Sequence, residues 1–217
     1  MIVSFGALGM ISLCNGSPAA AQGAVRSDVP IGWYVVDIYG SFAPLGQNDE
    51  LGINRGFSST PQPGLTIGFT AGAHVFPLRL GLITLGLGAT FHDSFRDKGP
   101  VPTEDEPNPD GPTLRKRFTA VSPQLSLNFG GRDGWSYLSA GTGTSRLALF
   151  ALNTDAATQR RAGTFNYGGG ARWFTNDHLA FALDLRFYNA GPLVASATEP
   201  GSPRSTIMVI NIGASFR

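Results

Sequence analysis

Large apolar side chains recur at every second position over most of this chain, and this alternation constrains its fold more than any other feature. Between residues 179 and 190 one face carries Leu179, Phe181, Leu183, Leu185 and Phe187. Successive side chains of a β-strand point to opposite faces, so this period indicates a strand with one apolar face. The pattern occurs eight times without a convincing helical stretch between: 32–42, 65–76, 80–92, 114–129, 135–150, 164–174, 179–190 and 206–216. The sequence therefore predicts eight strands.

Composition agrees with an all-β chain and excludes several other classes. Of 217 residues, 29 are Gly and 15 are Pro, which argues against a helical bundle. No run of 18 apolar residues occurs, so no transmembrane helix is expected. The net charge is only +1, which gives no basic field for binding nucleic acid.

The connections between the predicted strands alternate in length along the chain. Short links at 77–79, 130–134 and 175–178 suit tight hairpins. Long links fill 43–64, 93–113, 151–163 and 191–205. All short turns would then lie at one end and all long loops at the other. We expect an all-β, eight-stranded antiparallel up-and-down transmembrane β-barrel, with short periplasmic turns and long extracellular loops.

The less apolar face decides between a membrane barrel and a soluble one. It carries residues such as Thr84, Gly86, Asn166 and Gly168 rather than the Lys and Glu of a solvated wall, so it suits a narrow interior. With the large apolar face outward, aromatic residues would form a girdle near the short turns: Tyr34, Phe129, Trp135, Tyr137, Trp173 and Phe216. A second girdle near the long loops would hold Phe42, Phe91, Phe165 and Phe187. A soluble ligand-binding barrel, with these aromatics in its core, is the alternative.

The first residues have the pattern of a secretory signal peptide. Residues 1–13 are apolar and small, and Ala19-Ala20-Ala21 offers a cleavage site. A signal peptide normally opens with a positive charge, but no Lys or Arg precedes Arg26. We therefore expect the true start of the signal peptide to lie further upstream. We expect residues 1–21 to be removed and residues 22–217 to form one barrel domain. The alternative is a buried segment of the mature fold. Cleavage would also remove Cys14, the single cysteine, unless it carries a lipid.

With these features the chain resembles the small OmpA/OmpX-type outer-membrane barrel family over residues 31–217. The resemblance rests on the eight-strand plan, the signal peptide, segments such as NYGGGARWFTNDHLAFALDLRFY, and the aromatic Phe216 near the end. Family members usually end on the aromatic residue itself, whereas Arg217 follows here. The resemblance implies a bacterial outer-membrane location, outer-membrane lipid and lipopolysaccharide as neighbours, and insertion by barrel-assembly machinery. We expect a monomer with a structural or surface-interaction role, no enzymatic activity and an extracellular partner of unknown identity.

An eight-stranded barrel has an interior that side chains can fill, so a general pore is not expected. Inward ionisable groups must then be paired, because an isolated buried charge is costly. We predict a lumen network of ion pairs formed by Asp37, Arg172, Asp184 and Arg186. His74, His92 and Arg146 have the same predicted parity. The network would hold the barrel together; a proton or ion path is the alternative function.

His92 and Ser94 lie two apart on one strand, a spacing that lets an imidazole activate a hydroxyl. The pair is similar to one in the lipid A deacylase barrels. However, Phe187 and Asn189 stand in RFYNAG where that family's motif has His and Ser. Because the motif is incomplete, a lipid-modifying enzyme is kept only as an alternative to the structural or surface-interaction role.

The loop after the third strand carries acids and prolines, and we expect it to be mobile and extracellular. It has no calcium-loop register, and the three histidines lack a metal-ligand spacing, so no metal or cofactor is predicted. Arg115 and Arg117 follow the loop. They are candidates for contact with lipopolysaccharide phosphates, or for pairing with the acids just before them.

Overall fold

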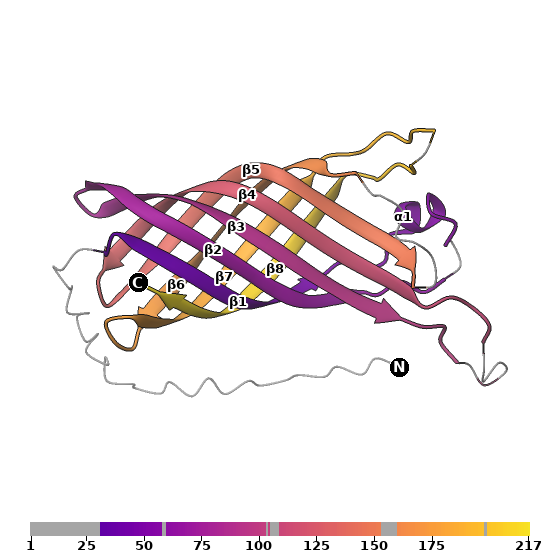
Figure 1. Ribbon diagram of the computed structural model, residues 1–217, viewed down its shortest axis with the longest axis horizontal. Helices are drawn as coiled ribbons and strands as arrows, with labels where there is room; N and C mark the ends of the chain where they lie inside the picture. Colours follow the sequence, from indigo (N-terminus) through magenta and orange to yellow (C-terminus); the bar gives the residue numbers. More distant parts are fainter. Residues whose placement is uncertain (1–30, 58–59, 103, 105–108, 153–159, 198) are drawn as a thin grey trace, which may run out of the picture.

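Eight antiparallel strands close into one barrel (Figure 1). The computed structural model describes residues 31–57, 60–102, 104, 109–152, 160–197 and 199–217, so the predicted signal peptide lies outside the described residues. The strands are β1 (Tyr34–Pro44), β2 (Leu65–Leu80), β3 (Ile83–Lys98), β4 (Leu114–Gly131), β5 (Gly134–Ala151), β6 (Ala162–Phe174), β7 (Leu179–Ala190) and β8 (Ser205–Phe216). Consecutive strands pair, and β1 closes the sheet by pairing with β8. This confirms the predicted up-and-down barrel.

The two ends of the barrel differ as predicted. In Figure 1 the short β2–β3, β4–β5 and β6–β7 turns lie at one end with the C-terminus, and the long loops lie at the other. One helix, α1 (Asp49–Ile53), follows β1 at the long-loop end. Among the described helices, none has the length and apolar character needed to cross a membrane.

The β2–β3 turn lies later than predicted. We expected it at 77–79, but β2 continues to Leu80 and the turn is formed at Gly81, which has a φ of 60°. Pro77 lies inside the strand, where the β2–β3 register shifts between Val75 and Leu78. Because Pro has no N–H to donate to the ladder, a bulge accommodates it without ending the strand.

The barrel buries its polar side chains and exposes its apolar ones. Ile38, Leu125 and Leu138 on the outer face are 55, 66 and 60% exposed. Inward positions hold buried residues such as Asp37 and Asn211. This is the reverse of a soluble ligand-binding barrel. A closed sheet leaves no unpaired edge, so an apolar wall of this kind can face lipid.

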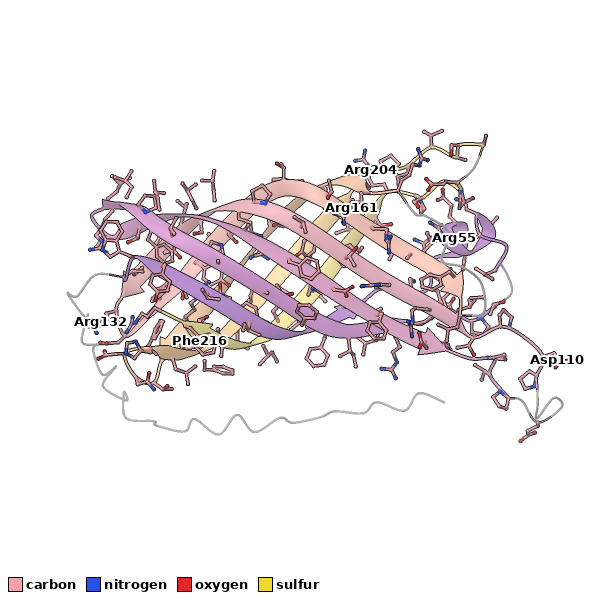
Figure 2. The ribbon with its side chains drawn as sticks, viewed as in Figure 1. Arg55, Asp110, Arg132, Arg161, Arg204 and Phe216 are labelled. Atoms are coloured by element: carbon pink, nitrogen blue, oxygen red, sulfur yellow. The ribbon has the colours of Figure 1, made fainter. Side chains whose placement is uncertain are left out.

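The aromatic girdle near the short turns is smaller than predicted. Tyr34, Phe129, Trp173 and Phe216 point outward and are 39 to 52% exposed; Phe216 is labelled at this end in Figure 2. Placing Trp135 and Tyr137 in the girdle was wrong, because both point into the lumen and are 3 and 4% exposed. The cause is the hairpin register: paired residues share a face, and Phe129 pairs with Ser136. The neighbours of Ser136 therefore face inward.

Candidate functional site

The part of the lumen nearer the short turns holds a buried ion pair between β1 and β6. Arg172 donates from Nε to Asp37 Oδ1 at 2.9 Å and from Nη2 to Oδ2 at 2.7 Å. Ser215 on β8 donates to the same carboxylate at 2.5 Å. The Arg172 guanidinium also lies over the Tyr137 ring, 4.1 Å from its centroid. Arg172 thus reaches across the barrel to Asp37, and not to a neighbouring strand.

A second buried pair lies on β7. Arg186 donates to Asp184 Oδ2 at 2.9 Å, and the two side chains are 2 and 3% exposed. Tyr137 donates to the same oxygen at 2.8 Å, and Asn211 donates to Oδ1 at 2.8 Å. Donors from three strands therefore hold this carboxylate.

Hydrogen bonds extend from the Asp184–Arg186 pair to every strand of the barrel, and the Asp37–Arg172 pair contacts the same network through the Tyr137 ring. Arg186 donates to Asn166, which also accepts from Gln124. Asn211 accepts from Ser41 and Thr70. The lumen network, as we call it, consists of Asp37, Ser41, Thr70, Thr90, His92, Gln124, Tyr137, Ser139, Asn166, Arg172, Asp184, Arg186, Asn211 and Ser215. Two carboxylates balance two guanidinium groups within the network. These four groups belong to the four residues predicted from the sequence: Asp37, Arg172, Asp184 and Arg186.

The remaining predicted lumen residues divide between the two faces. His74 points inward, with Nδ1 3.6 Å from Asp37 Oδ2. The prediction that Arg146 faces inward was wrong, because its neighbour Ser145 is the buried residue and shares a hydrogen bond with Thr164 on the lumen side. A strand can turn only one of two adjacent residues inward.

His92 and Ser94 meet, but not on the lipid-facing wall. His92 Nε2 lies 3.0 Å from Ser94 Oγ, and His92 Nδ1 lies 2.8 Å from Thr70 Oγ1. The partner on the far side of the imidazole is therefore a hydroxyl instead of a carboxylate. Both residues are 0% exposed, and the His92 ring packs against the rings of Phe118 and Tyr188. No membrane lipid can reach this pair in the closed barrel.

Helix α1 covers the lumen at the long-loop end. Leu51 is fully buried against Leu114 and Leu149. Asn48 caps the helix by accepting from the Leu51 N–H at 2.9 Å, and Asp49 and Glu50 occupy the first turn. No helix was predicted at this position, although the Asn-Asp-Glu start of α1 is a usable signal for a helix N-terminus.

Polar contacts fix the segment around α1 to the barrel. The buried Lys116 ammonium of β4 donates to the Gly46 carbonyl at 2.8 Å and to Gln62 Oε1 at 3.2 Å. Arg55, on the loop outside the strands, donates to Ser202 Oγ at 3.0 Å, and burial lowers its pKa. The segment that carries α1 is thus tied both to the lumen wall and to the β7–β8 loop.

At the rim beside the long loops, Arg115 and Arg117 are paired with acids. Arg115 makes a bidentate pair with Asp97 at 2.6 and 2.7 Å, and Arg117 makes one with Asp93 at 2.8 and 2.7 Å. Asp93 and Asp97 were predicted to lie in a mobile loop, which was wrong, because β3 continues to Lys98 and carries both. No group of three or more His, Cys, Asp or Glu able to hold a metal occurs in the described part of the chain.

Comparison with known proteins identifies no family. No family model and no curated protein matches the chain. Among solved structures it is similar to Ail of Yersinia pestis, crystallised with the heparin analogue sucrose octasulfate, at 11% identity and a TM-score of 0.47, over 85% of this chain and 96% of that one.

Two further structures have comparable scores. Neisserial surface protein A has 11% identity and a TM-score of 0.47, over 85% of this chain and 95% of that one. The outer membrane protein OprG from Pseudomonas aeruginosa has 13% identity and a TM-score of 0.47, over 87 and 96%. Membership of the OmpA/OmpX-type family stays a prediction. The closed eight-stranded barrel, with its apolar wall and its separated short turns and long loops, is that of a bacterial outer-membrane protein.

Proposed function

We propose that this outer-membrane barrel serves a structural and surface-interaction role through its long loops, and that its lumen is not a conducting path. The observation that carries the proposal is the lumen network, which joins all eight strands around two ion pairs. Arg172 and Arg186 are each 2% exposed. A solute would have to displace both pairs, and breaking a buried pair costs about 3–5 kcal/mol.

The long-loop end adds a second barrier. Leu51 of α1 is buried against the ends of β4 and β5, so apolar packing covers the mouth above the network. The parts of the molecule that remain accessible outside the membrane are then the loops themselves. These are the surfaces on which a partner would act.

Conductance recording tests the closed lumen. The purified protein, refolded in detergent and added to planar bilayers, is expected to give no unitary current steps, with a general porin as the positive control. Discrete steps from the wild-type protein in the heat-modifiable, folded state would contradict the proposal.

Thiol labelling on intact cells tests the orientation. Asp110 and Arg132 lie at opposite ends of the barrel in Figure 2. A membrane-impermeant maleimide is expected to label Asp110→Cys but not Arg132→Cys, with the unsubstituted protein giving the background. The reverse pattern would place the long loops in the periplasm and remove the surface role.

We also infer that the His92–Ser94 contact serves packing and not lipid hydrolysis. Supporting this, His92 uses both ring nitrogens within the lumen. Purified protein incubated with lipid A is expected to release no acyl chain. Release by the wild type that is lost in His92→Ala would establish the enzyme instead.

A further inference from the structure

Three arginines on the outer side of the barrel at the long-loop end have no acidic partner among the described residues. Arg146 lies near the end of β5, Arg161 immediately precedes β6, and Arg204 immediately precedes β8. Strand alternation turns all three outward, and Arg161 and Arg204 are exposed. Figure 2 labels Arg161 and Arg204 toward this end of the barrel. Within the described residues, none of the three guanidinium groups has a hydrogen bond or an ion pair.

Two of these cations lie one position beyond the end of a strand ladder. Ser145 pairs with Ala162 at the end of the β5–β6 ladder. The next positions along the two strands are Arg146 and Arg161, which therefore share one face of the wall. Like charges directly opposite each other are destabilising. An anion bound between them would remove this repulsion.

The neighbouring part of the same wall is arranged differently. There, Arg115 and Arg117 each have a bidentate carboxylate from β3. Carboxylates of β3 thus neutralise the arginines of β4, and Glu199 pairs with Arg160, whereas no described carboxylate pairs with Arg146, Arg161 or Arg204. Within the described part of the chain, these three cations therefore remain open to an external anion.

The height of the group matches the membrane surface. Phe165 points outward on β6 and is 47% exposed. Arg161 lies four residues further along, about 13 Å along the strand. Because aromatic residues mark the edges of the apolar layer, the guanidinium groups stand at the level of the lipid headgroups. Arg161 and Arg204 are two strand spacings apart across the sheet, about 10 Å, and two positions apart along it, about 7 Å. This separation suits a headgroup with two separated phosphates.

We propose that Arg146, Arg161 and Arg204 form a binding site for the phosphate groups of lipopolysaccharide in the outer leaflet. The planar guanidinium forms paired hydrogen bonds with phosphate oxygens. The proposal deepens the surface role and rests on the long loops facing outward. It adds a site to the predicted contact at Arg115 and Arg117, whose guanidinium groups already bind carboxylates.

Binding of lipid A to the folded, full-length barrel in detergent tests this site. The probe is bisphosphoryl lipid A, compared with its enzymatically dephosphorylated form and with phosphatidylglycerol. We expect the wild type to prefer the bisphosphoryl form. An arginine near a charged membrane surface contributes about fivefold in affinity, so Arg146→Gln, Arg161→Gln and Arg204→Gln together are expected to weaken binding on the order of 100-fold.

A matched variant removes three arginines from the opposite rim: Arg79→Gln, Arg132→Gln and Arg217→Gln. It has the same net charge as the first triple variant, and it is expected to bind lipid A like the wild type. Heat-modifiability on gels shows that each variant is folded. Equal losses in the two triple variants, or equal binding of dephosphorylated lipid A or phosphatidylglycerol, would overturn the proposal. Because this assay does not depend on orientation, failure of the surface role would instead appear in the thiol labelling.

Discussion

Replacing Arg172 by Met tests whether the lumen network stabilises the barrel. The substitution removes both hydrogen bonds to Asp37 and leaves that carboxylate 2% exposed, with Ser215 as its remaining hydrogen-bond donor. Met has a flexible apolar side chain of similar length, so the cavity term is small. The dominant effect is an unpaired buried charge, which costs about 3–5 kcal/mol in the free energy of unfolding.

The partner substitution gives the second side of a double-mutant cycle. Asp37→Asn alone leaves the Arg172 guanidinium without its carboxylate, and we expect a similar loss. When both are replaced, no uncompensated charge remains, and removing a whole buried pair is often close to neutral. The double variant should therefore be more stable than the sum of the single losses predicts, by about 2–3 kcal/mol or more.

Urea unfolding of the barrel in phosphatidylcholine vesicles, followed by tryptophan fluorescence, measures these differences. Arg132→Met is the control, because the Arg132–Asp177 pair is exposed, with the two side chains 45 and 70% accessible. Exposed ion pairs contribute about 0–1 kcal/mol to the free energy of unfolding. The reasoning is refuted if Arg172→Met behaves like the control, or if the two lumen substitutions prove additive.

Three smaller predictions concern packing. Gly170→Ala would place a methyl group 2.7 Å from Tyr137 Oη and is expected to destabilise the barrel by about 1–3 kcal/mol; Gly163→Ala meets nothing within 4 Å and should leave the temperature of the gel shift unchanged. Tyr137→Phe removes a hydrogen bond to a buried carboxylate, and urea unfolding should show a loss of about 1.5–3 kcal/mol. Leu51→Ala should loosen α1 and speed tryptic cleavage beside it without changing the barrel's melting, whereas Ile53→Ala, at a 62% exposed position, should have no effect; an equal cleavage rate in both would contradict the packing account.

The strands could be predicted because alternation is a local property of the sequence. The range predicted for β7 is the one observed, and the apolar residues of that strand leave only one choice of face. β5 was harder to orient, because WSYLSAGTGTS carries apolar or aromatic residues on both faces. Phe129 and Trp135 were both placed outward, which the two-residue turn at Arg132 and Asp133 does not permit. Hairpin register, applied to these two residues, would have corrected the assignment.

The partners within the lumen could not be predicted from spacing. Alternation places Asp37 and Arg172 inside, but their contact depends on how far a guanidinium reaches across the closed barrel. The same applies to Asp93 and Asp97 at the rim. A segment rich in acids and prolines is predicted as a loop, and only the structure shows that these two acids pair with arginines of β4. The candidate site was therefore predicted as a set of residues, and its pairing came from the structure.

The pairing of β1 with β8 has a consequence for how the barrel assembles. Asp37 lies on the first strand, Ser215 on the last, and Arg172 on β6, 135 positions after Asp37. A sheet with seven ladders formed and this seam open would hold Arg172 without its carboxylate. Closure of the seam supplies the missing counter-charge, so the Asp37–Arg172 pair stabilises the sheet only after its two ends have met. Contacts made only in the closed form slow unfolding rather than speed folding, and the seam should therefore prolong the lifetime of the finished barrel.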